Sequence, residues 1–220
     1  SIEAISENAI LLVWPEKIDQ TQHQSILNYQ IEIETNLKPY IIELVSAYNS
    51  LIIYYDFTLI PYQSIINILG KLVQSTPKSS TSNNIETLIE IPVHYSLESG
   101  WDLSNISTNT GLSIEEIVSL HSDKTYHAYA LGFTPGFCYL ASVDQQIRLP
   151  RKQSPRIKIP KGSVAIAEQQ TAVYPNSSPG GWHILGQTPI DMYTVNNKTG
   201  DFIPKIFVGD SVQFKPIDLE

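Results

Sequence analysis

Residues 132–140 read Gly-Phe-Thr-Pro-Gly-Phe-Cys-Tyr-Leu, and Pro-Lys-Gly-Ser-Val-Ala-Ile-Ala (160–167) and Ser-Pro-Gly-Gly-Trp (178–182) follow in the same half of the chain. Seven of the fourteen prolines lie between residues 129 and 189. Proline fixes φ and glycine permits positive φ, so loops that contain many of these residues have a defined shape. From residue 126 onward, short apolar runs alternate with such turns, which predicts a closed or nearly closed β-barrel. The expected strands include Val164–Ala167, Ile190–Val195 and Ser211–Phe214.

The first part of the chain has a different pattern. Its hydrophobic periodicity predicts the order strand, helix, strand, strand, helix, strand, which is the split βαβ plan of ferredoxin-like domains. The expected strands are 9–14, 40–46, 50–55 and 85–93, and the expected helices are 18–34 and 61–73. A Ser/Thr/Asn-rich segment, 75–84, predicts a flexible loop before the last strand.

Two short helices, 102–109 and 113–121, are expected after a boundary near residue 95. A capping box of Ser113 with Glu116 opens the second helix, and Gly111 ends the first. We therefore predict an α+β protein with a ferredoxin-like domain at 1–94 and a β-barrel domain at 95–220.

Positive charge gathers in one short stretch of an otherwise acidic chain, whose formal net charge is -8. No Asp or Glu lies between Asp144 and Glu168. The local field suits a small phosphate or carboxylate better than a nucleic acid, which needs a wider basic face. Arg151 and Arg156 each follow a proline, which stiffens the segment that presents their guanidinium groups. The alternative is a solvated basic pair of edge strands. The six cations are Arg148, Arg151, Lys152, Arg156, Lys158 and Lys161.

Aromatic residues accompany these cations, and we expect them to wall a binding cleft or to pack in the barrel core, with at least half in the core. They are Phe133, Phe137, Tyr139, Tyr174 and Trp182. Gly180 and Gly181 allow backbone N–H groups to approach an anion. They equally fit a tight hairpin with Trp182 packed beneath it.

Several other kinds of site are not indicated. The five histidines form no zinc-type pair, and neither a P-loop, a Gly-x-Gly-x-x-Gly fingerprint nor a Gly-x-Ser-x-Gly elbow occurs. The single cysteine, Cys138, excludes an internal disulfide and has no nucleophile signature around it. No apolar run is long enough to span a bilayer and no secretory leader opens the chain, so we expect a cytoplasmic protein.

Taken together, these motifs resemble the KipI / allophanate hydrolase subunit 1 family, whose members are also called the B subunit of 5-oxoprolinase (PxpB). The resemblance includes Gly-Phe-Thr-Pro-Gly-Phe, the repeated Pro-Arg, Ile-Pro-Lys-Gly-Ser-Val-Ala-Ile-Ala and Ser-Pro-Gly-Gly-Trp. Ser50–Asp56 and Ile91–Val93 extend it into the N-terminal part, so it covers nearly the whole chain.

The resemblance implies an N-terminal ferredoxin-like domain and a C-terminal cyclophilin-like β-barrel. It also implies a heteromeric complex with a KipA-like partner (allophanate hydrolase subunit 2, the C subunit) and a LamB/YcsF-type partner (the A subunit). Such a complex hydrolyses 5-oxo-L-proline to L-glutamate with ATP, with Mg²⁺ and nucleotide held mainly elsewhere in the complex. The family leaves two alternatives open, an inhibitor of a histidine kinase and a component of an allophanate hydrolase or urea amidolyase. Neither a nucleic acid nor a membrane is expected as a partner.

Combining the residues with the resemblance gives a set of candidate substrate- or nucleotide-binding positions. They are Phe133, Phe137, Tyr139, Arg151, Arg156, Lys161, Gln170, Tyr174, Gly180, Gly181 and Trp182. No catalytic residue and no metal ligand is assigned. The chain departs from the family pattern at Glu168, Gln169 and Ala172, where glycines are usual, and at Cys138, where proline is usual. These changes restrict the backbone, and Glu168 adds a negative charge beside the expected anion site.

Overall fold

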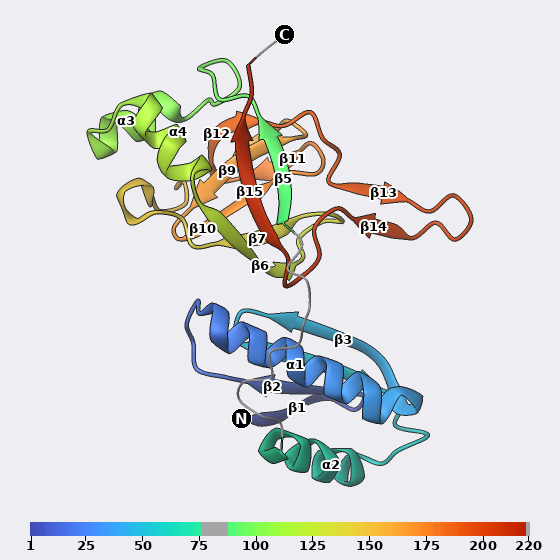
Figure 1. Cartoon of the computed structure of the whole chain (residues 1–220). Helices are drawn as coiled ribbons and strands as arrows, with labels where there is room; N and C mark the ends of the chain where they lie inside the picture. The colour runs from blue at the N-terminus through green and yellow to red at the C-terminus, as the bar shows by residue number, and fades with distance from the viewer. Residues whose placement is uncertain (76–87, 219–220) are drawn as a thin grey trace. The chain divides into compact units, whose positions relative to one another are not determined.

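The protein is described here as a computed structural model that covers residues 1–75 and 88–218. The chain divides into two compact units, Ser1–Ile85 and Glu86–Glu220 (Figure 1). The division therefore falls before the strand that the sequence analysis assigned to the first domain, and not after residue 94. The predicted loop at 75–84 lies outside the described residues, apart from Ser75 at the end of the second helix.

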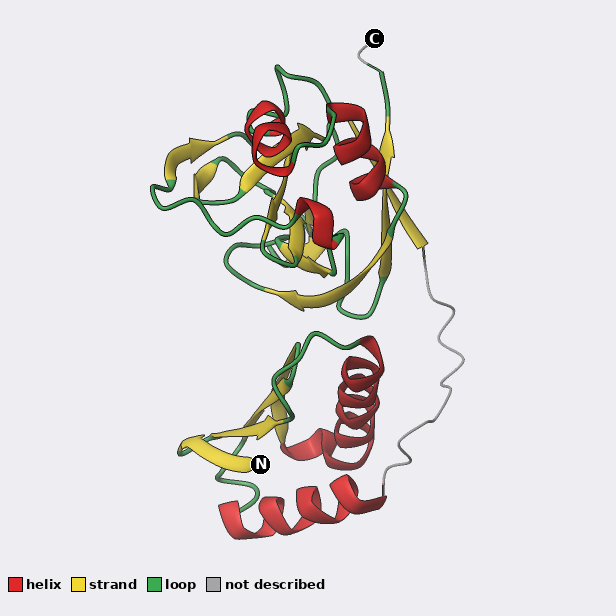
Figure 2. Ribbon diagram, turned by 90° about the vertical axis from the view of Figure 1, so that its left-hand side faces the viewer, coloured by secondary structure: helices red, strands yellow, loops and turns green. Residues whose placement is uncertain are grey.

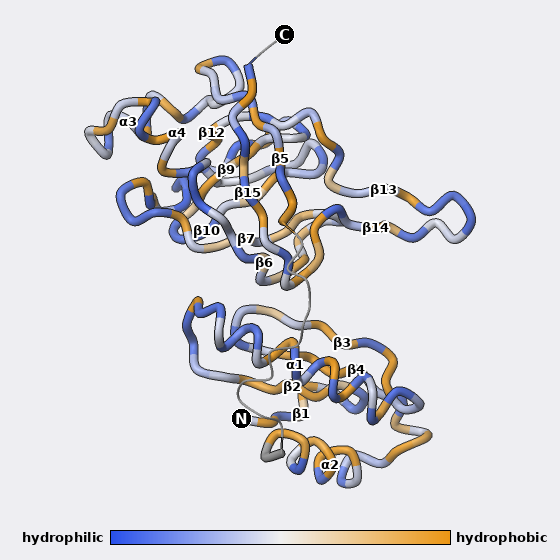
Figure 3. The backbone as a smooth tube through the Cα atoms, viewed as in Figure 1, coloured by the Kyte–Doolittle hydropathy of each residue, from blue (hydrophilic) through white to orange (hydrophobic). Residues whose placement is uncertain are grey.

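The first unit is a four-stranded antiparallel sheet in the order β1-β2-β4-β3. Figure 2 shows both of its helices on one face of that sheet. Figure 3 shows hydrophobic residues recurring along the second helix, as the predicted buried stripe requires. The elements are β1 (Ile2–Ser6), β2 (Ala9–Val13), α1 (Gln20–Leu37), η1 (Lys38–Tyr40), β3 (Ile41–Ala47), β4 (Ser50–Tyr55) and α2 (Tyr62–Ser75).

The predicted ferredoxin-like plan is wrong in one strand. The order strand, helix, strand, strand, helix is present, but the sheet position beside β2 is taken by β1. β1 is an exposed edge strand, and its sequence, Ile-Glu-Ala-Ile-Ser, does not alternate strictly between apolar and polar residues. The strand expected to complete this sheet, found as β5 (Leu88–Val93), pairs in the second unit instead.

The second unit is built on a seven-stranded sheet in the order β12-β9-β10-β7-β6-β15-β5. Its strands are β5, β6 (Thr125–Leu131), β7 (Cys138–Ala141), β9 (Ser163–Ala167), β10 (Gln170–Val173), β12 (His183–Gln187) and β15 (Ser211–Pro216), with η2 (Gln145–Ile147) after β7. Two further strand pairs are β8 (Arg156–Ile159) with β11 (Ser178–Gly180), and β13 (Tyr193–Val195) with β14 (Phe202–Pro204).

The two outer strands of this sheet meet, which makes it barrel-like. β5 runs parallel to β15 over six residue pairs, and His94, directly after β5, forms an antiparallel bridge with Gln187 at the end of β12. The His94 amide donates to the Gln187 carbonyl at 2.8 Å, and the Gln187 amide returns a bond at 3.1 Å. The predicted nearly closed sheet is thus confirmed, whereas the finer cyclophilin-like assignment stays a prediction.

Two helices, α3 (Leu103–Thr110) and α4 (Ile114–Ser122), precede β6 and match their predicted positions within a residue or two. The capping box is confirmed, because the Ser113 hydroxyl accepts from the Glu116 amide and the Glu116 carboxylate accepts from the Ser113 amide. Gly111 ends α3 with φ of 76°, the left-handed conformation that favours glycine. α3 matters for function because Asp102 lies immediately before it.

Candidate functional site

Asp102 is the centre of a buried charged cluster in the second unit. Its side chain is 3% exposed, and both oxygens accept hydrogen bonds from the guanidinium of Arg156, at 2.7 and 2.8 Å. The ammonium of Lys152 lies 2.7 Å from Oδ1, and the amide of Ile184 donates to Oδ2 at 2.8 Å. Asp102 therefore fixes the basic segment between η2 and β8 against the start of α3 and against β12.

Burial by itself would raise the pKa of Asp102. The hydrogen bonds from Arg156, Lys152 and the Ile184 amide outweigh it and lower the pKa from 3.8 to about 2. The same pairing raises the pKa of Arg156. Asp102 thus stays ionised at neutral pH. One carboxylate faces two cations, so the cluster of Asp102, Lys152 and Arg156 has a net charge of one positive.

The other cations of the basic segment do not all point to one place. Arg151 is exposed, and its Cζ lies 5.8 Å from the ring centroid of Trp182. Lys161 forms an ion pair with the exposed Asp191. Arg148 donates from Nε to the Val143 carbonyl at 2.9 Å, and Lys158 is exposed. The structure therefore brings Lys152 and Arg156 together on Asp102, whereas Arg148 and Lys161 have partners of their own.

Most of the predicted aromatic residues form core, as the alternative interpretation expected. Phe137, Tyr174 and Trp182 are 2%, 2% and 5% exposed. The Phe137 ring centroid lies 5.5 Å from that of Tyr174 and 5.7 Å from that of Trp182, with the rings edge to face. Tyr139 is half-buried beside them, whereas Phe133 is 65% exposed at φ of 69°. Packed rings of this kind do not wall an open cleft.

The remaining candidate positions are Gly180, Gly181 and Gln170. A Cβ on Gly180 would collide with the Tyr174 hydroxyl, so this glycine is required by packing over the aromatic core. Gly181 accepts a hydrogen bond from the Lys152 amide through its carbonyl, at 2.8 Å. Gln170 begins β10 and pairs in register with Ala141 and Ala167. β11, which ends at Gly180, pairs with β8 and not with β12, so the two glycines do not form the tight hairpin that was the alternative. The anion cradle stays a prediction.

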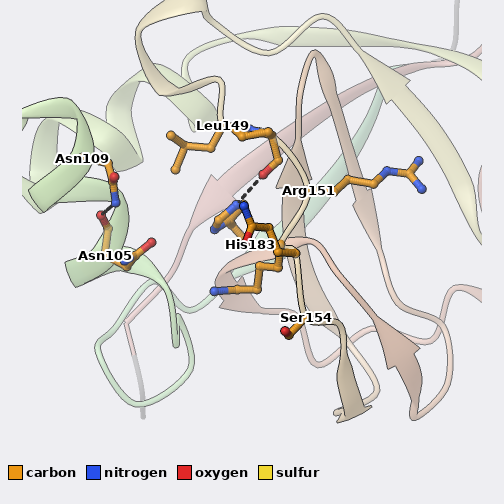
Figure 4. Close-up of a pocket in the computed structure, with 9 residues that line it drawn as sticks. Asn105, Asn109, Leu149, Arg151, Ser154 and His183 are labelled. Carbon is orange, nitrogen blue, oxygen red and sulfur yellow. Dashed lines mark hydrogen bonds between the residues drawn. The ribbon is translucent and has the colours of Figure 1, made fainter.

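The structure places one pocket beside the Asp102 cluster. The segment 149–154 forms one wall, Asn105 and Asn109 of α3 face it, and His183 lies between them (Figure 4). The volume of this pocket is about 540 Å³, within the range of small-ligand sites. In Figure 4 the side chain of Arg151 points away from the pocket, whereas the imidazole of His183 lies on the α3 side of the segment.

Neither a reactive thiol nor a metal-binding cluster is found in the described part of the chain. Cys138 is buried, and burial raises the pKa of its thiol, so a thiolate nucleophile is not available there. Residues 1–75 and 88–218 contain no group of three or more His, Cys, Asp or Glu side chains that could hold a metal ion. None of the helices among these residues is long and apolar enough to cross a membrane. Glu168, one of the departures from the family pattern, is exposed and has φ of 54°.

Sequence reasoning missed the residues that organise this site. Asp102 lies 54 positions before Arg156, and no local pattern links a helix-capping position to a distant basic segment. Asn105, Asn109 and His183 line the pocket from two different elements. Asn105 and Asn109 are four residues apart, which is about one helical turn. This spacing alone could have indicated that the two amides share one face of α3.

Comparison with known proteins supports the family that the motifs suggested. The family model for the carboxyltransferase domain, subdomain C and D, matches residues 1–203. The B subunit of 5-oxoprolinase from Bacillus subtilis (strain 168) is 34% identical over 202 residues, which covers 87% of this chain and 83% of that protein.

Two solved structures extend the comparison. The crystal structure of TTHA0988 superimposes with a TM-score of 0.81 at 32% identity, over 96% of this chain but 40% of that one. This chain thus spans less than half of the length of TTHA0988. The Kluyveromyces lactis urea carboxylase superimposes over 99% of this chain and 22% of its own, with a TM-score of 0.68 at 16% identity, which shows a shared fold alone.

The fold and the family match define a carboxyltransferase-type domain of the subdomain C and D class. Within that class, the chain belongs to the family formed by the B subunits of 5-oxoprolinase.

Proposed function

We propose that this chain is the B subunit of an ATP-dependent 5-oxoprolinase, which hydrolyses 5-oxo-L-proline to L-glutamate. The observation that supports this most is the match, over most of the chain, to relatives that are named as 5-oxoprolinase B subunits. The Asp102 cluster adds a physical reason, because its excess positive charge suits a substrate that has a carboxylate.

The chemistry explains why such an enzyme needs ATP and several subunits. A lactam carbonyl is a poor electrophile, and phosphorylation of its oxygen turns that oxygen into a good leaving group. The nucleotide and Mg²⁺ bind mainly in other subunits under this proposal. This chain then contributes substrate binding and charge stabilisation. The complex works in the cytoplasm, where ATP is plentiful.

The candidate residues take different roles in this proposal. Arg151, held over Trp182, remains exposed and is available to a ligand or to a neighbouring protein of the complex. Arg156 acts as a positioning residue. Its guanidinium makes two hydrogen bonds to Asp102, and Asp102 in turn holds the ammonium of Lys152. Lys161 is paired with Asp191, so of the predicted cations it is the one that we least expect to contact the substrate.

The partners in this proposal are a KipA-like protein of the allophanate hydrolase subunit 2 type and a LamB/YcsF-type protein, the C and A subunits of the complex. The likeness to TTHA0988 fits a larger assembly, because this chain matches only 40% of that longer protein. Under this proposal the rest of the assembly comes from the two partners.

Reconstitution of the three proteins tests the proposal. We expect glutamate release from 5-oxoproline that requires ATP and that stops when this chain is left out. Turnover of allophanate in place of 5-oxoproline would assign the chain to a urea-degrading enzyme. Inactivity of every mixture, together with binding to a histidine kinase, would assign it to inhibition instead.

A further inference from the structure

The pocket between α3 and the segment 149–154 contains a buried hydrogen-bonding atom that has no partner among the described residues. His183 is 7% exposed, and its Nε2 lies 2.8 Å from the Pro150 carbonyl. A carbonyl oxygen only accepts, so Nε2 holds the proton and donates it. In the neutral ring Nδ1 is then an acceptor, and this buried atom has no hydrogen-bond partner in the described part of the chain.

An unsatisfied buried acceptor costs stability unless a water or a ligand donates to it. His183 lines the pocket, and Figure 4 shows its ring on the side that faces Asn105 and Asn109. Nδ1 has almost no exposed surface in this structure, so a ligand N–H or O–H group can supply the missing donor once the side chains around that atom move aside.

The positive charge beside the pocket favours a ligand that has an anionic group. Lys152 lines the pocket and also reaches Asp102, whose single negative charge is already shared with Arg156. The nine residues that line the pocket include no Asp or Glu. Because the net charge of the cluster is one positive, an anionic group on the ligand gains attraction without facing a carboxylate of the wall.

The opposite wall is polar and uncharged. Asn105 and Asn109 lie one turn apart on α3, and the Asn109 amide nitrogen donates to the Asn105 backbone carbonyl at 2.7 Å. That bond fixes Asn109, so that its side-chain oxygen remains available as an acceptor. Amide groups of this kind recognise a carbonyl or an N–H group of a small polar molecule.

We propose that this pocket binds a small carboxylate that has a neighbouring N–H group, with the carboxylate toward Lys152 and the N–H donated to Nδ1 of His183. The inference rests on the proposed function, under which 5-oxoproline is the ligand. Its lactam N–H and its carboxylate are attached to the same carbon atom, so one molecule meets both requirements. No residue of the predicted aromatic set takes part.

Calorimetry on the full chain with 5-oxoproline and two analogues tests the proposal. N-methyl-5-oxoproline keeps the carboxylate and lacks the N–H, and 2-pyrrolidinone keeps the N–H and lacks the carboxylate. We expect each analogue to bind at least about tenfold more weakly than 5-oxoproline, the loss typical of one hydrogen bond or ion pair in a pocket. Equal affinity for all three compounds, or no binding of 5-oxoproline to the full chain, would overturn the proposal.

Two substitutions of one residue separate the ligand contact from the structural one. His183→Gln places an amide near Nε2, keeps the bond to Pro150 and removes the acceptor at Nδ1. His183→Asn places its amide near Nδ1 and removes the bond to Pro150. We expect the glutamine variant to lose about tenfold in affinity at unchanged stability, and the asparagine variant to retain binding better while losing stability. The reverse order would contradict the assignment.

A blocking variant makes the test independent of His183. Asn105 is exposed, so Asn105→Trp fills the pocket without disturbing the core, and Ser104→Trp places the same ring on the same helix outside the lining. Only the first is expected to abolish binding.

The outcome also separates this inference from the proposed function. A complex that turns over 5-oxoproline with an unchanged KM in the Asn105→Trp variant keeps the function and rejects the pocket. Binding that depends on His183, in a complex with no ATP-dependent glutamate release, keeps the pocket and rejects the function.

Discussion

The carboxylate of Asp102 exchanges its water for two hydrogen bonds from Arg156, one from Lys152 and one from the Ile184 amide. An exchange of this kind stabilises the fold only while every partner is present, because a buried charge without its partner costs more than the pair gains. Arg156 also lies 5.5 Å from the ring centroid of Trp101, which extends the contacts of its guanidinium.

Asp102→Asn keeps the size of this side chain and removes its charge, so Lys152 and Arg156 are left as two half-buried cations side by side. We expect the free energy of unfolding to fall by about 3 kcal/mol at pH 7. The folded pKa of about 2 lies below the ordinary value of 3.8. The stabilising effect of the carboxylate is therefore complete above about pH 4 and is lost as the pH falls through about 2.

Urea unfolding of the wild-type protein and the Asp102→Asn variant at pH 7, 4, 3 and 2 measures this dependence. The difference between the two proteins is expected to be constant from pH 7 to 4 and to shrink below that. Asp123→Asn is the matched control, since Asp123 is exposed at the end of α4. A difference that persists undiminished at pH 2 would show that the charge of Asp102 is not what stabilises the cluster.

At this scale the sequence predicted which residues are basic and that they lie together, but not which acid they meet. Residues 145–167 contain no Asp or Glu, as the sequence shows. Some of the basic side chains of this segment nevertheless have carboxylates beside them in the folded protein. Asp102 and Asp191 come from distant elements, and no pattern within one segment encodes such a contact.

Among the elements, α4 is joined to the barrel by a chain of hydrogen bonds in which His121 and Thr171 are fully buried and Tyr95 is half-buried. The Thr171 hydroxyl donates to the Ala165 carbonyl at 3.1 Å, so it accepts from Nε2 of His121 at 2.8 Å. Nδ1 of His121 then accepts from the Tyr95 hydroxyl, also at 2.8 Å. Burial lowers the pKa of His121 to about 3, so the ring stays neutral at pH 7 and the chain has a single consistent direction.

Thr171→Val keeps the shape of the side chain and leaves the buried His121 N–H without its acceptor. We expect a loss of about 2 kcal/mol in the free energy of unfolding. Thr171→Ser keeps the hydroxyl and removes one methyl group, at a cost of about 1 kcal/mol. Urea unfolding at pH 7 distinguishes the two, and a valine variant at least as stable as the serine variant would mean that the hydroxyl contributes nothing.

The elements that could be predicted are those whose signals are local. α4 has its capping box and α3 its glycine stop, and both helices lie where expected. β1 was not predicted, and the sheet that β5 joins was predicted wrongly, because a strand becomes part of a sheet only through its partners. β5 was correctly expected as a strand and assigned to the wrong sheet, since periodicity does not specify whether β2 or β15 lies beside it.

For the whole molecule, the position of β5 decides where an independently folding second unit begins. Ile91 and Val93 are fully buried in the core of that unit, and β5 is the only neighbour of β15 on that side in the described sheet. His94 then joins the sheet to β12. A fragment that starts at residue 95, the predicted boundary, lacks both the strand and the closing bridge.

We therefore expect a fragment of residues 86–220 to unfold cooperatively in urea and a fragment of residues 95–220 not to do so. The shorter fragment exposes Phe214 and Val212 on β15, which are fully buried in the intact unit. Loss of several buried aliphatic side chains, at about 1.5–3 kcal/mol each, exceeds the stability of an ordinary domain of this size. Near-ultraviolet circular dichroism of the two fragments at equal concentration gives the comparison, because fixed aromatic packing is required for the signal. A 95–220 fragment with the same spectrum and the same urea midpoint as the longer one would place the boundary after His94 and remove β5 from the second core.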